Sequence, residues 1–382
     1  MRLDRVVVKT YSSLDALPKS YVDLFEKSSI HWYDFSLPWF RNFERTALDE
    51  GDKVRIYGVE RNPGGNAPIA ALATRFNEKP EGLFSGTQLS SLSNFYTITF
   101  SPLYDSGADG SEEATAAIAR AIVADNHKWD RVELRPLDPN SPVYSCLANS
   151  FRAAGMVVQK YFCFGNWYLA TAGLSYPEYF KALPSAMQNT INRKTKKLNK
   201  TGSARVEIVT GTENLEPTIQ AYEKIYLSSW KRPEPYPHFV SGLIRAFVER
   251  GWLRMGVIYI DDQPVASQIW IVNSGKATIY KLGQDQRYDE FSAGSILTAR
   301  LMEHVLEVDR VQEVDFGSGD DPYKKNWLPQ RRERWGILAM NPRSVAGCIG
   351  IVRNVGGRAT KNAWRAVRER LRNNKSAPHK ST

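Results

Sequence analysis

The sequence predicts an α/β (α+β) protein made of two tandem domains with mixed central sheets, followed by a basic C-terminal helical tail. The chain has 382 residues, more than one core usually supports, since single cores stop growing at roughly 250–300 residues. Its residues are 42% hydrophobic and 24% charged, as in ordinary globular proteins. Strand-like and helix-like segments also alternate in a similar order in both halves, which indicates sheets covered by helices.

The first half is expected to hold a hairpin framed by helices and further strands. We expect helices at 20–27, 38–48, 111–126 and 141–154, and strands at 54–60, 68–75, 95–103, 131–137 and 156–169. The turn residues Asn62 to Gly65 predict a hairpin between the strands at 54–60 and 68–75. Ala114, Ile118 and Ile122 form one apolar helical face.

The second half repeats this order of elements. We expect helices at 176–181, 185–200, 215–230, 239–249 and 294–307, a short helical segment at 321–327, and strands at 206–209, 253–260, 263–272, 277–283, 313–316 and 333–340. Each half then contains a hairpin, a third strand, a helix, a strand, a short helical segment and a closing strand. The repeat predicts domains at 1–165 and 166–342, with a tail at 343–382.

Several classes of protein are excluded by composition. Cys146, Cys163 and Cys348 are odd in number and widely spaced, so we expect neither a disulfide framework nor a metal site. The apolar run near the N-terminus, Val6 to Val8, is shorter than the roughly 7–15 residues of a signal peptide. No stretch approaches the roughly 20 apolar residues of a membrane span. We therefore expect a cytoplasmic protein.

The positive charge is concentrated in the tail. The net charge is +10, and the residues from 341 onwards hold ten Lys or Arg and a single acid, Glu369. Trp364, Val367 and Leu371 form one apolar face within a basic segment at 360–372. This pattern is typical of an interfacial helix that binds anionic lipid at the inner face of the membrane. A nucleic-acid patch and a helix packed on the body are the alternatives.

The first block with chemical content joins a strand to a helix. The strand ends at Gly283, and the helix begins at Ser292-Ala293-Gly294-Ser295. Backbone N–H groups and the positive dipole end of a helix attract anions, and glycine lets a ligand approach closely. Ser292, Ala293, Gly294 and Ser295 therefore predict a site for a pyrophosphate. The alternative is that Ser292 is a plain N-cap and that Gly294 relieves packing.

The second block follows the next strand and brings titratable groups to the same end of the sheet. Acyl transfer needs a base for the nucleophile and an acid for the leaving thiolate. We predict Asp285 as the base and Tyr323 as the acid, with Lys324 binding phosphate or polarising a carbonyl. Asp315 and Trp327 are candidates for substrate binding. The alternatives are that Asp315 caps a loop, that Tyr323 packs on Trp327 and that Lys324 is solvated.

Together, these blocks resemble the GNAT-superfamily acetyltransferase domains typified by the cellulose-biosynthesis protein CelD. That family carries Tyr-x-x-Gly-x-Asp, then a Ser-Pro-Gly turn, then Asp-Phe-Gly-x-Gly followed by Tyr-Lys and Trp. The matching residues here are Tyr280, Gly283, Asp285, Ser292, Gly294, Asp315, Phe316, Gly317, Gly319, Tyr323, Lys324 and Trp327. Ala293 stands where the family usually has Pro.

The resemblance implies two tandem GNAT-like domains, of which the second carries the acyl-donor site. It implies acetyl-CoA or another acyl-CoA as donor, no metal, and transfer to an amine or hydroxyl of a small molecule, sugar or peptide. The acceptor would belong to cell-envelope or exopolysaccharide metabolism. The first half lacks the Gly-x-Gly and Tyr-Lys signals, so we interpret it as degenerate and as shaping the acceptor groove. Its aromatic residues Trp32, Tyr33, Phe35 and Trp39 either line that groove or belong to the core.

Two other interpretations stay open. The family is similar to Fem-type transferases, which pair two GNAT folds and use aminoacyl-tRNA as donor. The basic helix at 185–200 would suit a CoA phosphate, an RNA backbone or plain solvation. The third interpretation is a non-catalytic interaction module of a polysaccharide-synthesis complex. Among these interpretations of the function, nucleic acid takes part only as tRNA, in the Fem-like one.

Overall fold

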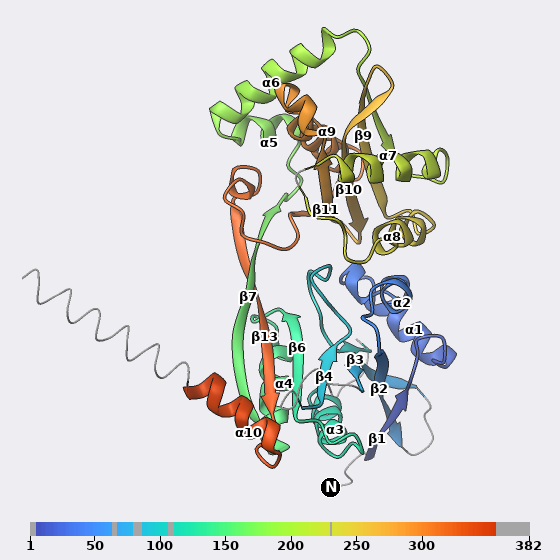
Figure 1. Cartoon of the computed structure of the whole chain (residues 1–382), viewed down its shortest axis with the longest axis vertical. Coiled ribbons are helices and arrows are strands. Elements are labelled where there is room, and N and C mark those ends of the chain that lie inside the picture. Colours follow the sequence, from blue (N-terminus) through green and yellow to red (C-terminus); the bar gives the residue numbers. More distant parts are fainter. Residues whose placement is uncertain (1–4, 63–66, 79–85, 106–110, 230, 357–382) are drawn as a thin grey trace, which may run out of the picture.

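The structure is a computed structural model that describes residues 5–62, 67–78, 86–105, 111–229 and 231–356. The two halves of the chain lie end to end and form an elongated molecule (Figure 1). The N-terminal half occupies the lower part of that view and the C-terminal half the upper part.

The first half contains seven strands and four α-helices among the described residues. In chain order they are β1 (Arg5–Tyr11), α1 (Lys19–Ser28), the 3₁₀ turn η1 (Tyr33–Phe35), α2 (Leu37–Thr46), β2 (Asp52–Asn62), β3 (Pro68–Asn77), β4 (Gln88–Ser91), β5 (Leu103–Tyr104), α3 (Ser111–Val123), β6 (Arg131–Leu137), α4 (Pro142–Ala153) and β7 (Val157–Ala170). The predicted hairpin is present as β2 and β3, which pair antiparallel.

The second half begins with helices and continues with a run of strands. Its elements are α5 (Tyr176–Ala182), α6 (Ser185–Asn199), β8 (Arg205–Val209), α7 (Leu215–Leu227), α8 (Phe239–Val248), β9 (Leu253–Ile260), β10 (Gln263–Asn273), β11 (Lys276–Gln284), η2 (Gln286–Phe291), α9 (Ala293–Glu307), β12 (Glu313–Asp315), η3 (Lys324–Asn326), β13 (Gln330–Met340), α10 (Val345–Ile351) and η4 (Val352–Gly356).

All of these strands belong to one mixed sheet. The order is β1-β2-β3-β4-β6-β13-β7-β12-β11-β10-β9-β8, with β5 paired to β3. Each half contributes one parallel pair, β4 with β6 and β11 with β12, and the remaining pairs are antiparallel. In each half, a helix (α3 or α9) lies between the two parallel strands in the chain, as expected from the internal repeat. The predicted fold class is confirmed, although the two central sheets merge into a continuous one.

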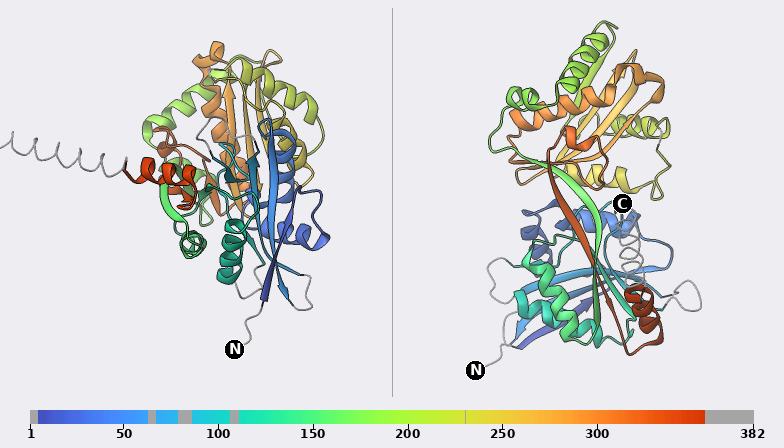
Figure 2. Two further views of the ribbon diagram at one scale, coloured as in Figure 1. Left: turned by 60° about the horizontal axis from the view of Figure 1, so that its bottom comes forward. Right: turned by 90° about the vertical axis from the view of Figure 1, so that its left-hand side faces the viewer.

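The long strands β7 and β13 exchange partners between the halves. β7 closes the first half in sequence but pairs with β12 of the second half, through Tyr168 opposite Asp315. β13 closes the second half but pairs with β6 of the first half, through Met340 opposite Arg131. The two strands also pair with each other along the whole of β13, and Figure 2 shows them running from one half into the other. The predicted division between 165 and 166 falls inside β7.

The largest hydrophobic core extends across the junction of the halves. It contains residues of α2 from the first half and of α8 from the second. The Trp39 ring lies edge-on to the Phe239 ring at 5.4 Å, and the Asn42 side chain donates to the Phe239 carbonyl at 2.9 Å. A second core packs α9 on β9 to β11, with Leu297 and Leu301 fully buried. One face of α9 is therefore buried.

Local differences from the sequence-based prediction have physical reasons. The range 95–103, predicted as a strand, is irregular as far as residue 102, because the N–H groups of Ile98 and Thr99 donate to the Asp34 carboxyl group at 2.9 Å instead of to a neighbouring strand; only its last residue, Leu103, belongs to a strand, β5. β1 and β4 were not predicted. In the tail, Ser344 caps α10 by accepting from the Gly347 N–H at 3.1 Å. The predicted amphipathic segment at 360–372 lies outside the described residues. In the part of the chain that the structure describes, no helix is both long and apolar enough to span a bilayer.

Candidate functional site

The two parallel strands of the second half separate from each other near their carboxyl ends. β11 and β12 pair only from Lys276 opposite Glu313 to Thr278 opposite Asp315. β12 then ends, while β11 continues to Gln284. The carboxyl ends of parallel strands are where α/β folds place their ligands, so this separation marks the first place to search for a site.

A cavity of about 470 Å³ lies where the strands separate, and we call it the cleft cavity. β11 contributes the residues from Ile279 to Leu282, and the loop after β12 contributes Phe316 to Ser318. The first half closes it with Phe95, Tyr96 and Ile98. The cleft cavity therefore has walls from both halves of the chain.

The loop after β12 is held in place by a buried lysine. Gly317 and Gly319 have φ angles of +65° and +101°, which side chains other than glycine rarely adopt. The Lys324 ammonium donates to the Ser318 carbonyl at 2.6 Å and lies 3.3 Å from the Asp321 carboxylate. Burial lowers the pKa of Lys324. Lys324 lines the cleft cavity, with its ammonium group directed to the loop.

Tyr323 also lines the cleft cavity. Its ring lies edge-on to Phe316 at 5.7 Å, and the residue is 45% exposed. Burial of the ring in the cavity wall raises the pKa of Tyr323 to about 12. The phenol is therefore protonated at neutral pH and can donate a proton or a hydrogen bond. Trp327 is buried but does not line the cleft cavity, and its backbone carbonyl accepts a hydrogen bond from the Tyr179 hydroxyl at 3.1 Å.

Asp285 lies at the end of β11, beyond the lining residues. Its carboxylate accepts from the Arg287 backbone N–H at 3.0 Å and forms a bidentate pair with the Arg287 guanidinium. Hydrogen bonding to Arg287 lowers the pKa of Asp285. The group is therefore an ionised carboxylate that begins the turn η2.

The start of α9 is organised around Gly294. Ser292 has a left-handed backbone (φ +51°), and its side chain makes no cap hydrogen bond, unlike the plain N-cap considered for it. The Gly294 N–H donates to the Gln284 side-chain oxygen at 3.0 Å, and a Cβ on Gly294 would lie 2.7 Å from that oxygen. With glycine at this position, the Gln284 side chain can approach the backbone closely. Ala293 is buried and Ser295 is half-buried in the first turn.

A cationic surface of α6 borders this helix start. An open surface hollow of about 660 Å³ is lined by residues of α6 and by Lys200, which follows the helix; its cations are Arg193, Lys196, Lys197 and Lys200. α6 contacts η2 directly, because the Lys197 ammonium pairs with the Glu290 carboxylate at 2.5 Å. The basic helix therefore lies beside the loop that leads into α9.

The sequence interpretation missed a polar cluster in the cleft cavity. Lys231, Lys281 and Tyr96 line it, and Lys281 pairs with the buried Glu234 carboxylate at 2.5 Å. Tyr96 also donates a short hydrogen bond to Glu234. Burial, together with the nearby Lys281, lowers the pKa of Lys231 to about 8. A lysine inside an apolar strand, such as Lys281, was the signal that could have indicated this cluster.

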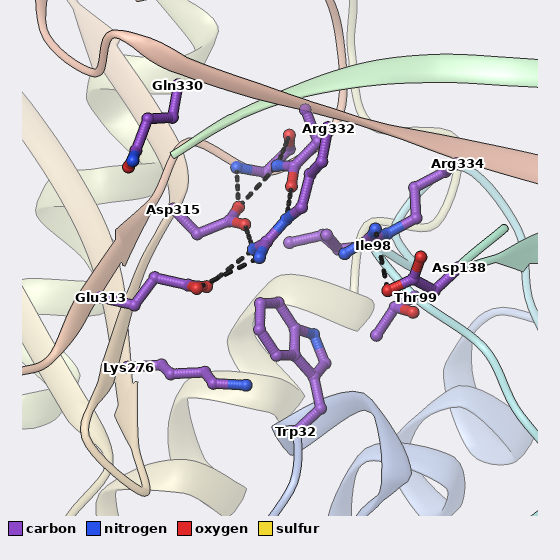
Figure 3. Close-up of polar contacts among 12 residues, drawn as sticks. Trp32, Ile98, Thr99, Asp138, Lys276, Glu313, Asp315, Gln330, Arg332 and Arg334 are labelled. Carbon is purple, nitrogen blue, oxygen red and sulfur yellow. Dashed lines mark hydrogen bonds and ion pairs between the residues drawn. The ribbon is translucent and has the colours of Figure 1, made fainter. Parts of the chain in front are cut away.

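Asp315 lies behind the cleft cavity and does not line it. Its carboxylate accepts from Asn166 of β7 at 2.8 Å and from the Gly317 N–H at 2.6 Å. It also pairs with Arg332 of β13, as Figure 3 shows. Asp315 therefore joins the exchanged strands to the loop that forms the cavity wall. Of the predicted site residues, the structure brings Tyr323 and Lys324 together in the cavity, whereas Asp285, Asp315, Trp327 and the helix start at 292–295 are not part of its lining.

No metal centre is indicated in the described ranges, where no group of three or more His, Cys, Asp or Glu residues is placed to hold an ion.

Comparison with protein families places this site in a recognised domain. Residues 185–325 match the model of the acetyltransferase (GNAT) domain, which is less than half of the chain. The matched range includes the cleft-cavity residues of the second half. A comparison with curated proteins finds no match.

Solved structures resemble nearly the whole chain. FemX superimposes with a TM-score of 0.58 at 9% identity, over 87% of this chain and 96% of that one. A tandem GNAT protein from the clavulanic acid biosynthesis pathway gives 0.50 at 12% identity, over 89% and 100%. The C-terminal domain of a putative lysylphosphatidylglycerol synthetase from Agrobacterium fabrum gives 0.50 at 12% identity, over 87% and 96%. These likenesses show the fold, two GNAT-like domains in tandem, that the sequence predicted.

Proposed function

We propose that this protein is a GNAT-type acyltransferase that moves an acetyl or other acyl group from acyl-CoA to an amine or hydroxyl. The observation that carries the proposal is the cleft cavity between β11 and β12, within the range that matches the GNAT domain. The acceptor nitrogen or oxygen would attack the thioester carbonyl, the C–S bond would break, and the CoA thiolate would take a proton.

The donor would extend from the cleft cavity to the start of α9. Its pyrophosphate would lie at Ser292 to Ser295, where the N–H groups and the helix dipole favour negative charge. The Gln284 side chain would release the Gly294 N–H when the phosphate binds. The cations of α6 beside η2 would attract the remaining phosphate charge.

Residues of the cleft cavity would move the protons. Tyr323 is protonated at neutral pH and would donate to the leaving thiolate. Lys231, whose pKa is about 8, would take the proton of the acceptor, because a base works best when its pKa is near the operating pH. Asp285, our sequence-based candidate for the base, would instead hold η2 and thereby position the helix start. Lys324 would keep the glycine loop in shape.

The acceptor would enter from the side of the first half, which supplies Phe95, Tyr96 and Ile98. We propose that it belongs to cell-envelope or exopolysaccharide metabolism. The resemblance to the family typified by CelD supports this, as does the likeness to FemX and to a putative lysylphosphatidylglycerol synthetase.

The test is calorimetric titration of the full chain with acetyl-CoA. We expect wild-type protein to bind at micromolar concentration and Ser295→Asp to bind at least about tenfold more weakly, since the new carboxylate would repel the pyrophosphate. An acid in the first turn suits the helix dipole, so the variant should fold. Ser274→Asp places the same charge in the exposed turn at the other end of β11 and should bind like wild type. If folded wild-type protein binds no acyl-CoA, the proposal fails.

The basic surface of α6 and the likeness to FemX favour one alternative, an aminoacyl-tRNA donor. In that case charged tRNA would bind tightly, and its affinity would fall steeply with salt because phosphate contacts release counterions. A filter-binding series over salt concentration, run beside the acetyl-CoA titration, separates the two donors.

A further inference from the structure

A second cavity, of about 220 Å³, lies at the junction of the two halves, and we call it the junction cavity. The first half lines it with residues from three segments, 31–35, 99–101 and 137–144. The second half contributes three cations, Lys276, Arg332 and Arg334. None of its lining residues lines the cleft cavity. Asp315 stands between the two, bonded to Gly317 on one side and to Arg332 on the other.

Arg332 is the one cation of the three whose charge is fully compensated. Its guanidinium pairs with Glu313 at 2.7 Å and with Asp315, and its Nε donates to the Asn166 side chain at 2.6 Å. Figure 3 shows this network above Trp32. Arg332 therefore has a structural role in joining β7, β12 and β13.

Arg334 is buried with little compensation. The residue is 3% exposed, and its nearest carboxylate is that of Asp138 at 3.9 Å, whose side chain is 43% exposed. One terminal nitrogen donates to the Glu333 carbonyl at 3.2 Å, and the Nε has no partner among the described residues. Burial lowers the pKa of Arg334. A buried cation without a close counter-ion is unfavourable, so an anion in this cavity would stabilise it.

Lys276 brings a second available charge to the same cavity. Its ammonium donates to the His31 carbonyl at 3.2 Å and lies 4.7 Å from the centre of the Trp32 ring. Within the described ranges no carboxylate lies within 4.0 Å of it. Figure 3 shows Lys276 and Arg334 on opposite sides of Trp32. The two charges thus flank one aromatic wall.

A third polar group of the lining also lacks a partner. The Tyr144 hydroxyl is buried and forms no hydrogen bond with any described residue. The Trp32 ring is held in place by Asp34, which accepts hydrogen bonds from the Trp32 indole at 3.2 Å and from the backbone N–H groups of Ile98 and Thr99. Buried polar groups are normally satisfied. Two unsatisfied donors and a lysine that lacks a carboxylate partner among the described residues therefore point to a missing ligand.

We propose that the junction cavity is a binding site for a small organic anion, a phosphate or a carboxylate, whose negative charge is compensated by Arg334 and Lys276 and which can bond to the Tyr144 hydroxyl. The faces of Trp32 and Phe100 would contact the carbon part of that molecule. Charge-assisted hydrogen bonds from guanidinium and ammonium groups are the usual means of holding such anions. Because the site is separate from the cleft cavity, it binds its ligand with or without an acyl donor.

The experiment is calorimetric titration of the full chain at constant ionic strength with inorganic phosphate, acetate and glucose 1-phosphate. We expect one of these probes to bind at millimolar concentration or below and to raise the melting temperature. Arg334→Gln and Lys276→Gln should each weaken that binding by at least about tenfold, since each removes one charge-assisted contact. The neighbouring Arg331→Gln removes the same charge from β13 at an exposed position and should bind like wild type.

The pattern of results identifies the ligand class or rejects the site. Binding of both phosphates points to a phosphate ligand, tighter binding of glucose 1-phosphate to a sugar phosphate, and binding of acetate alone to a carboxylate. Two outcomes would overturn the proposal: no binding of any probe by folded wild-type protein, or equal weakening in Arg331→Gln. If Arg334→Gln fails to fold, Lys276→Gln decides the question on its own, because Lys276 is only half-buried.

Discussion

At Asp34, a carboxyl group is buried beside the junction cavity, and this burial raises its pKa to about 8. The folded protein therefore holds a proton between pH 4 and 8 that the unfolded chain releases. The free energy of unfolding should fall as pH rises through this range, by about 1.4 kcal/mol per pH unit for one proton. Asp34→Asn removes this contribution. Urea unfolding at pH 5, 6 and 7 should show the wild type losing stability relative to the variant, while the exposed control Asp262→Asn tracks the wild type. Parallel curves for Asp34→Asn would contradict the pKa.

Lys231 provides a second test based on protonation. If it takes the proton of the acceptor, it acts in its neutral form, so kcat/KM should rise with pH through about 8 and then level off. Lys231→Met should abolish this rise and lower kcat by about 10²-fold or more, as is typical for loss of a general base. The exposed Lys181→Met should keep the wild-type profile. A profile unchanged in Lys231→Met would assign the base to another group, with Asp285→Asn as the next variant to measure.

The residues of the site were predictable to the extent that their chemistry is local in sequence. Tyr323 and Lys324 follow a strand and a glycine loop, and they do line the cleft cavity. Lys231 and Glu234 lie more than forty residues before the start of β11 and enter the site only through tertiary packing. The contacts of Arg287 with Asp285 and of Gln284 with the Gly294 N–H span only two and ten residues, but they depend on side-chain directions around η2, which the sequence pattern does not give.

At the scale of elements, alternation of apolar residues predicts that a segment is a strand but not which strand it pairs with. β7 and β13 were both predicted as closing strands, and their exchange between halves was not. One close contact between β13 and β7 depends on this exchange of strands. Gly336 of β13 lies opposite Tyr161 of β7, and a Cβ there would fall 2.2 Å from the tyrosine ring. This contact exists only if the last strands of the two halves pair.

Gly336→Ala should therefore destabilise the protein, because the tyrosine ring must move and loses its hydrogen bond to Glu133 at 2.6 Å. Overpacking of this kind costs about 1–3 kcal/mol. Gly211→Ala is the matched control, since a Cβ there meets nothing within 4 Å. Urea midpoints of the two variants give the comparison. Equal midpoints would mean that β7 and β13 do not pair as described.

At the scale of the whole molecule, the exchange of β7 and β13 joins two domains that the sequence repeat would allow to be independent. Each half takes a strand from the other, and one hydrophobic core crosses the junction between α2 and α8. Both cavities also take walls from both halves. A change in the packing of the halves would therefore alter the cleft cavity and the junction cavity together.

This interlocking predicts that the chain unfolds as one unit. Calorimetry of the full chain should give a single transition with equal calorimetric and van't Hoff enthalpies, the signature of two-state unfolding. Residues 1–165 expressed alone would lose β13 from beside β6. Residues 166–382 would keep the pairs of Tyr168 to Ala170 with β12 but would lose β7 up to Gly165, which pairs with β13 from Glu333 to Met340. Each fragment would then expose strand edges that invite aggregation. We expect neither fragment to give a cooperative transition by itself. Two separate transitions in the full chain, or a fragment that unfolds cooperatively, would show that the exchanged strands do not couple the halves.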